Sequence, residues 1–77
     1  MKVFLENGIT CLDLHGERHR DVENLVIDFV YRNQDLIPLL IICGNSQRMI
    51  AIVENSLEIN SIKFSSPRFG IIRIEKI

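Results

Sequence analysis

The chain begins with two short apolar runs separated by a pair of turn residues. Residues 3–5 and 9–14 flank Asn7-Gly8, a dipeptide whose residues both tolerate the positive φ angles of a type I′ turn. Such a turn joins two antiparallel strands. We therefore expect a short edge strand, a tight turn and a first main strand that ends near His15, with Gly16 after it.

The apolar spacing changes from about residue 19 to residue 33. Apolar side chains now recur at intervals of three and four, as on one face of an α-helix; they are Val22, Leu25, Val26, Phe29 and Val30. Residues 16–18 include no Ser, Thr or Asp, so the N-cap of this helix is weak. The segment predicts an amphipathic helix followed by a turn at residues 33–35.

Residues 36–43 are nearly all apolar, which is typical of a central strand covered on at least one face. Pro38 lacks an N–H group, so the first residues of this strand should be unpaired. Ser46 is a good N-cap for a second helix that extends to about Leu57. The remaining turn, strand, turn and last strand are expected at residues 60–61, 62–64, 66–68 and 70–77.

The predicted element order is therefore (β)βαβαββ. Two strand–helix–strand connections imply a parallel strand pair with a right-handed crossover, and the last two strands should be antiparallel. We predict an α/β fold, a two-layer sandwich with a mixed sheet of four to five strands and both helices packed on it. We expect residues 1–77 to form a single domain, in which residues 1–8 are an extra N-terminal edge strand and turn.

Composition excludes several classes of function. The 77 residues carry 9 basic and 10 acidic side chains, a net charge of −1, and 47% of them are hydrophobic. The charge excludes a nucleic-acid binder whose affinity comes from its overall charge, and the apolar fraction excludes an acidic disordered segment. The apolar run at residues 37–43 is about a third of a membrane span. We expect no membrane partner and, since residues 1–7 are not a signal peptide, a cytoplasmic location.

Cys11 and Cys43 lie inside apolar runs and not in a Cys-x-x-Cys pair. We interpret both as small buried apolar residues in a reducing compartment. A metal site made of Asp13, His15, His19 and Cys43 would match no recognised ligand spacing, so none is predicted. A divalent metal ion as cofactor stays an open question, because no ligand motif specifies one.

Candidate chemistry lies at the carboxyl ends of the two strands expected to be parallel, where open α/β sheets bind ligands. On the first strand, Asp13 and His15 are two residues apart, so the carboxylate could orient the imidazole as a general acid or base. Gly44, Asn45 and Ser46 follow the second strand and precede a helix N-terminus, whose free amides attract phosphate. The neighbouring basic residues are Arg18, His19, Arg20 and Arg48.

Each of these features also has a purely structural interpretation. Asp13 can form a turn or cap a helix, and His15 can be a solvated residue before a glycine. Asn45 and Ser46 can be only a turn and an N-cap. The residue pattern alone therefore gives a location for function and leaves its chemistry open.

Residues 12–16, Leu-Asp-Leu-His-Gly, resemble the LDLHG sequence that opens the small MutS-related (Smr) domain. In that family a helix follows, then a hydrophobic strand ending in a His-Gly-Lys-Gly-type motif, a second helix and two closing strands. This chain is similar over about residues 9–77. The resemblance implies a fold similar to the C-terminal domain of translation initiation factor 3. It also implies nucleic-acid binding and, in many members, endonuclease activity on DNA or RNA.

The resemblance implies roles for individual residues. Carried over by position, the acidic residue and the histidine of the motif are Asp13 and His15, which would be catalytic. Asp13 would orient or polarise His15 or a water molecule, and His15 would be the general acid or base. Residues expected to contact nucleic acid, from the motifs or their neighbourhood, are Gly16, Arg18, His19, Arg20, Gly44, Asn45, Ser46, Arg48 and Arg68.

The second motif departs from the family pattern. Cys43, Asn45 and Ser46 stand where the family usually has His, Lys and Gly. Loss of one charge-stabilising donor can cost on the order of a hundred- to a thousandfold in rate. Three functions therefore stay open: a weak or specialised endonuclease, a catalytically inactive nucleic-acid-binding module, and a small protein-interaction or assembly domain. The third would associate, for example as a homodimer, through the edge strand at residues 3–5.

Overall fold

The computed structural model describes residues 2–77, which form one five-stranded sheet and two helices. The elements in chain order are β1 (Val3–Glu6), β2 (Ile9–Asp13), α1 (His19–Arg32), β3 (Leu39–Ile42), α2 (Gln47–Ile59), β4 (Lys63–Arg68) and β5 (Ile71–Lys76). The strand order in the sheet is β1-β2-β3-β5-β4. Strands β2 and β3 are parallel, and every other neighbouring pair is antiparallel. The predicted α/β sandwich is therefore confirmed.

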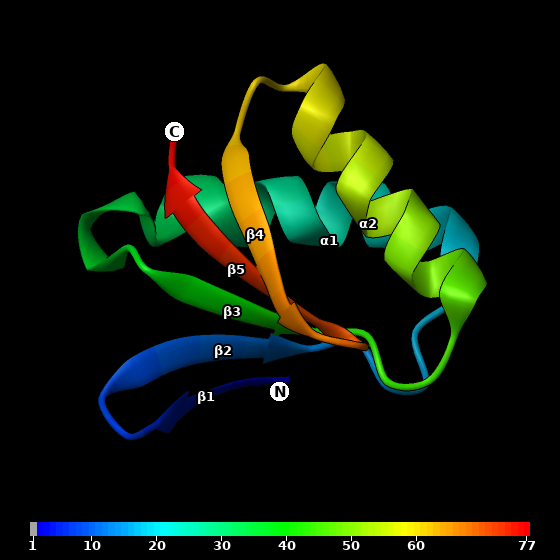
Figure 1. Ribbon diagram of the computed structural model, residues 1–77, viewed down its shortest axis with the longest axis horizontal. Coiled ribbons are helices and arrows are strands. Elements are labelled where there is room, and N and C mark those ends of the chain that lie inside the picture. Colours follow the sequence, from blue (N-terminus) through cyan, green and yellow to red (C-terminus); the bar gives the residue numbers. More distant parts are fainter. Residues whose placement is uncertain (1) are drawn as a thin grey trace.

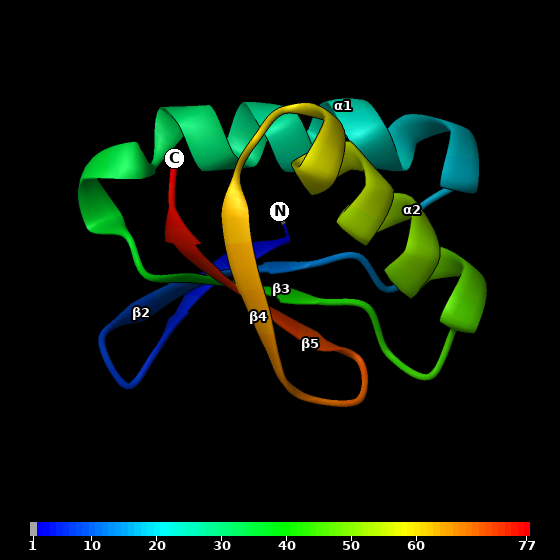
Figure 2. The ribbon, with the colours of Figure 1, turned by 45° about the horizontal axis from the view of Figure 1, so that its top comes forward.

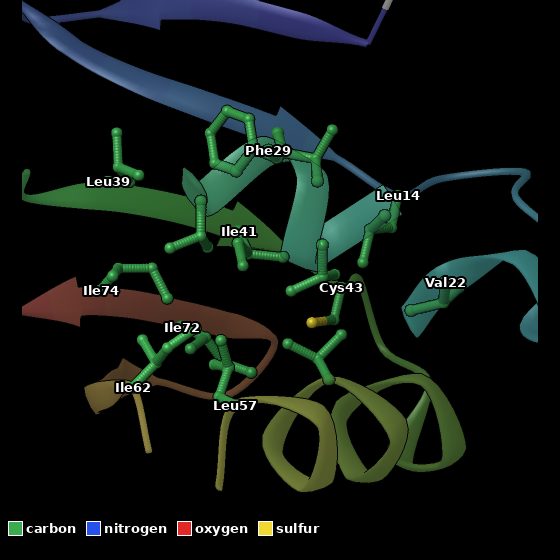
Figure 3. Packing of buried hydrophobic residues seen from close by; sticks show 14 of the residues in the cluster. Leu14, Val22, Phe29, Leu39, Ile41, Cys43, Leu57, Ile62, Ile72 and Ile74 are labelled. Carbon is green, nitrogen blue, oxygen red and sulfur yellow. The ribbon is translucent and has the colours of Figure 1, made fainter. Parts of the chain in front are cut away.

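Both helices lie on the same face of the sheet, so the molecule has two layers (Figures 1 and 2). The core lies between the layers and is formed by apolar side chains (Figure 3), and Ser56 and Thr10 are the buried polar residues of the part of the chain described. Its fully buried strand and helix residues include Leu39, Ile41, Ile72, Ile74, Val22, Val26, Val30, Val53 and Leu57. Within residues 2–77, neither helix has the length and apolar character that crossing a membrane requires.

The helix boundaries follow the predicted capping. Helix α1 begins after Arg18, whose side chain makes no capping hydrogen bond, in agreement with its weak predicted N-cap. Ser46 caps α2, because its Oγ accepts a hydrogen bond of 3.0 Å from the backbone N–H of Met49. The apolar stripe predicted for α1 is buried except at Leu25, which is half-buried.

Three strand boundaries differ from the prediction. Strand β2 ends at Asp13, so His15 lies in a turn beyond the strand. Strand β3 begins only at Leu39, because the residues before Ile37 form a 3₁₀ turn (Gln34–Leu36). The first residues of the predicted strand were expected to be unpaired because of Pro38, and in the structure Pro38 lies just before β3 and outside it.

The third difference concerns residues 66–68, which belong to β4 and not to the predicted turn. Pro67 is tolerated there because β4 is an edge strand, where a missing N–H need not break a ladder hydrogen bond. The register with β5 also shifts between Ser65 and Arg68, so the strand is irregular at the proline. The turn is instead made by Phe69 and Gly70.

The turn at Gly70 is packed directly against the loop that follows β3. The carbonyl oxygen of Gly70 accepts a hydrogen bond of 2.7 Å from the N–H of Cys43. Gly70 has a φ of +84°, and a Cβ atom on it would lie 2.3 Å from the carbonyl oxygen of Gly44. Only glycine fits this position, because both the backbone conformation and the close approach exclude a side chain.

We expect Gly70→Ala to lower the free energy of unfolding by about 3–4 kcal/mol, from positive-φ strain together with the backbone clash. Gly8→Ala is the matched control, since Gly8 has a φ of +80° but no atom within 4 Å of an added Cβ. Its expected cost is about 1–2 kcal/mol, from strain alone. Urea unfolding of the two variants measures the difference, and equal costs would show that the Gly70–Gly44 contact contributes nothing.

Candidate functional site

The ends of three strands meet at one end of the sheet (Figure 1). Asp13 of β2 pairs with Ile42 of β3, and one residue further on the N–H of Leu14 donates to the Ile42 carbonyl over 3.0 Å. The β4–β5 turn is joined to the same place by the Cys43–Gly70 hydrogen bond. We define the strand-end edge as Lys2 together with residues 13–21, 43–48 and 68–70.

The Asp13 carboxylate is used locally, within its own turn. Its Oδ1 accepts a hydrogen bond of 2.9 Å from the backbone N–H of His15. This bond from residue i to residue i+2 is an Asx turn, which is one of the structural roles expected for Asp13. The structure thus brings Asp13 close to His15, but through the His15 backbone, and the exposed imidazole has no hydrogen bond to the carboxylate within residues 2–77.

Lys2 is a member of the edge that the sequence patterns do not identify. Its Nζ donates a hydrogen bond to the His15 carbonyl oxygen, and it lies 3.7 Å from the position a Cβ would take on Gly16. The N–H of Asp13 also donates to the Lys2 carbonyl over 2.9 Å. The antiparallel pairing of β1 with β2, predicted from Asn7-Gly8, is what returns the start of the chain to this edge.

The other predicted contact residues fall into three groups along the edge. Arg18, His19 and Arg20 lie at the start of α1, and Arg48 lies in the first turn of α2. Arg68 ends β4 and belongs to a row of neighbouring residues across the sheet, Asp13, Ile42, Ile71 and Arg68. Three strand spacings separate the ends of this row, so Arg68 is about 14 Å from Asp13. The structure therefore places these residues on one edge but spreads them over its width.

In the loop from Gly44 to Ser46, one residue caps a helix and the other two are exposed to solvent. The Ser46 side chain is used for capping, as its structural interpretation predicted. Gly44 and Asn45 are exposed, and Gly44 has a φ of +72°. The loop therefore presents backbone and one amide side chain to solvent beside the N-terminus of α2.

Charge is distributed unevenly between this edge and the rest of the molecule. The strand-end edge holds five basic side chains, Lys2, Arg18, Arg20, Arg48 and Arg68, and three acidic ones, Asp13, Glu17 and Asp21. Its formal charge is therefore +2. The remainder has four basic and seven acidic side chains, a charge of −3. A chain with a net charge near zero thus carries an excess of positive charge at its strand-end edge.

The basic side chains of the edge are not neutralised by ion pairs. Among residues 2–77 there are two ion pairs, Arg32–Asp28 and Arg73–Glu75, and both lie outside the edge. The five basic side chains of the edge are also exposed. Their charges are available to a ligand, whereas those of Arg32 and Arg73 are already partnered.

Neither cysteine provides a reactive thiolate. Both are free and buried, as predicted, and Cys43 lies among core side chains (Figure 3). Burial, with a smaller contribution from Glu54, raises the pKa of the Cys43 thiol to about 11. Burial also raises the pKa of Cys11. Within the described chain no three His, Cys, Asp or Glu residues are grouped so that they could hold a metal ion.

A groove of about 590 Å³ lies between α1 and the first two strands. Its apolar lining residues are Val3, Leu12, Leu25 and Phe29, and its polar or charged ones are Lys2, Glu17, Asp28, Arg32 and Asn33. Sequence patterns do not reveal this groove, because it depends on how far α1 extends over the sheet. The groove therefore adjoins the strand-end edge, with which it shares Lys2 and Glu17.

We expect the Cys43 thiol to make stability depend on pH in alkaline solution. Its folded pKa is above the unfolded value, so the native state keeps its proton while the unfolded state loses it. The contribution of this thiol to the free energy of unfolding is therefore fully present below about pH 9 and is lost as the pH rises toward 11. In urea unfolding, the stability difference between wild type and Cys43→Ala should shrink by about 2–3 kcal/mol from about pH 8 to about pH 11. A stability difference that stays constant over this pH range would contradict the burial of the Cys43 thiol.

Comparisons of the chain with models of protein families, with curated proteins and with solved structures give no match. The likeness of residues 12–16 to the Smr motif stays a prediction from the sequence. The site is therefore interpreted from its own geometry and charge.

Proposed function

We propose that the chain is a nucleic-acid-binding module that holds the phosphate backbone at its strand-end edge, without hydrolysing it. The observation that carries the proposal is the excess of five exposed basic side chains over three acidic ones along one edge of a chain whose remaining charge is −3. Half or more of the hydrogen bonds in such complexes go to phosphates and sugars, and Arg and Lys are their principal donors.

The near-neutral total charge is compatible with this proposal. At physiological ionic strength a charge is screened beyond about 8 Å, so a phosphate at the edge responds mainly to its nearest side chains. Distant carboxylates such as Glu75 have little effect there. Affinity would then depend on a few arginines and not on the overall field of the protein.

Two helix N-termini support an anion site at the same edge. Helices α1 and α2 both begin there, and the first backbone amides of a helix have no carbonyl partner within it. In α2 the Met49 amide is already bonded to the Ser46 side chain, so the amides before it are the ones that would meet an anion. The amides and the helix dipole favour negative charge. They add to the arginines, which provide the independent charge on which the proposal depends.

Two features favour binding over hydrolysis. The Asp13 carboxylate accepts the His15 backbone N–H, so it is not aligned with the imidazole as a base-orienting group would be. Asn45 also offers no positive charge where the Smr pattern has a lysine. The resemblance to Smr domains supports recognition of DNA or RNA, while these local features support the inactive alternative.

The salt dependence of binding tests the proposal. Fluorescence anisotropy with labelled single-stranded and duplex oligonucleotides, of both DNA and RNA, gives log Kd against log salt concentration. For Arg48→Gln with Arg68→Gln, we expect the magnitude of the slope to fall by about 1.4 on single strands or about 1.8 on duplex. Each lost phosphate contact removes about one released counterion.

The matched control is Lys63→Gln with Lys76→Gln. These lysines are exposed, pair with each other across β4 and β5, and lie at the other end of β4 from Arg68. The control changes the net charge by the same amount, so its slope should stay at the wild-type value. Equal slopes in all three proteins, or no binding at low salt, would overturn the proposal.

Incubation with supercoiled plasmid and with structured RNA tests the absence of hydrolysis. We expect intact substrate under conditions where binding is measured. Nicking by wild type that disappears in Asp13→Ala with His15→Ala would instead establish an endonuclease. If the double variant still binds, the strand-end edge would remain the nucleic-acid-binding surface even though hydrolysis is lost.

A further inference from the structure

The two edges of the sheet are protected to different degrees. Strand β4 contains Pro67 and has two register shifts against β5, and such irregularity discourages pairing with another chain. Strand β1 has no proline, its register with β2 is continuous, and all four of its residues are exposed. Strand β1 is short, but a regular edge with exposed apolar side chains of this kind can be a template for a further strand.

The backbone of β1 has hydrogen-bonding groups left for such a strand. The N–H of Asp13 donates to the Lys2 carbonyl, so Lys2 and Asp13 form a hydrogen-bonded pair. Bonded and non-bonded pairs alternate along antiparallel strands, so Phe4 is also bonded to β2, whereas Val3 and Leu5 are not. The N–H and C=O groups of Val3 and Leu5 therefore point to the free edge.

The sequence from Lys2 to Glu6, Lys-Val-Phe-Leu-Glu, is complementary to itself. We propose that β1 pairs with β1 of a second copy of this chain, antiparallel and centred on Phe4. Each Lys2 then opposes Glu6 of the other copy, Val3 opposes Leu5, and Phe4 opposes its own symmetry mate. The free backbone groups of Val3 meet those of Leu5 at both ends, which closes the ladder.

This register also agrees with the faces of the sheet. Phe4 pairs with Cys11, which points away from the helices, whereas Val3 pairs with Leu12 of the core. A two-fold axis through the Phe4 pair, perpendicular to the sheet, keeps the helices of both copies on one face. The two Phe4 rings, each 39% exposed in one chain, then pack on the open face as a cross-strand aromatic pair.

On the helix face, the same register covers part of the apolar groove. Leu5 is 71% exposed, the largest exposed fraction among the apolar side chains of β1. In the pair it lies next to Val3 of the other copy, and Val3 lines the groove beneath α1. The second copy therefore shields an apolar surface of the first copy that the helices of the first copy leave open. The Lys2 ammonium has three N–H donors, so its hydrogen bond to the His15 carbonyl leaves two for Glu6 of the other copy. These opposed charges specify this register over one shifted by two residues.

The interface is limited to one short strand from each copy, so the association should be weak, on the order of 100 µM. Sedimentation equilibrium over a concentration range that spans this value measures it. Glu6→Lys places two cations opposite each other at both ends of the ladder, and we expect the dissociation constant to rise at least about tenfold. The double exchange Lys2→Glu with Glu6→Lys restores opposite charges and should return the constant to near wild type.

Disulfide trapping tests the register itself. Opposed residues of a non-bonded antiparallel pair have Cα atoms about 4.5 Å apart, within the range that a disulfide bridges. In a Cys11→Ala background, which removes the thiol next to position 4, Phe4→Cys should form a covalent dimer on mild oxidation. Leu5→Cys is the matched control, because it faces Val3 and not itself, and it should cross-link much more slowly.

A monomer at all concentrations, or equal cross-linking of the two cysteine variants, would overturn the proposal. So would a dimer that Glu6→Lys leaves intact, since its interface would lie elsewhere. The proposed pairing does not depend on nucleic-acid binding. Both the charge-exchange and the disulfide measurements are made without nucleic acid, so either proposal can fail alone.

Discussion

Two backbone hydrogen bonds just beyond the ends of the strands hold the loops after β2 and β3 and the β4–β5 turn together. The candidate site depends on this contact between the three segments. Leu14 donates to Ile42, and Cys43 donates to Gly70, so the ladder across β2, β3 and β5 continues one step into the loops. The close approach of Gly70 to Gly44 then leaves no room for a side chain between the last turn and the loop after β3. Three chain segments that are distant in sequence thereby become neighbours.

This constraint determines where charge accumulates. Arg18 ends the loop after β2 and Arg20 lies in the first turn of α1. Arg48 follows the loop after β3, and Arg68 precedes the turn between β4 and β5. None of them is close to all the others along the chain, yet all lie on the edge that these bonds assemble. A protein with a total charge of −1 can therefore present a local excess of positive charge.

Much of the fold could be predicted from the sequence because its patterns have local causes. Asn7-Gly8 specifies its hairpin through positive φ, Ser46 specifies a helix start through its side-chain oxygen, and the spacing of Val22, Val26 and Phe29 specifies the buried face of α1. The turn predicted at residues 66–68 was wrong because the tolerance for Pro67 comes from its place at a sheet edge, which is a property of the assembled sheet.

The candidate site was predictable in location but less so in detail. The strand order indicated which loops would meet, and Asp13, Arg48 and Arg68 do lie on that edge. The sequence left open whether the Asp13 carboxylate faces the His15 imidazole or its backbone, because the answer depends on where β2 ends. The contribution of Lys2 was missed, since no local motif marks a residue that reaches the edge through strand pairing.

The two edge strands of the sheet differ in how readily they could pair with another chain. Strand β4 is irregular and β1 is regular, exposed and self-complementary. The two surfaces proposed to bind ligands therefore differ in chemistry: the strand-end edge is basic, and the free side of β1 offers backbone groups flanked by apolar side chains. Binding at one need not block the other, although Lys2 belongs to both.

The most direct test of the central claim is an amide chemical-shift titration of the ¹⁵N-labelled chain with a short unlabelled oligonucleotide. If the strand-end edge holds the phosphate backbone, saturable shifts should concentrate in Lys2 and residues 13–21, 43–48 and 68–70. The amides of Lys63 and Lys76, at the other end of β4 and β5, should change little. Shifts centred on the open face of the sheet or on β1, or no saturable shifts at low salt, would contradict the assignment of this edge as the nucleic-acid surface.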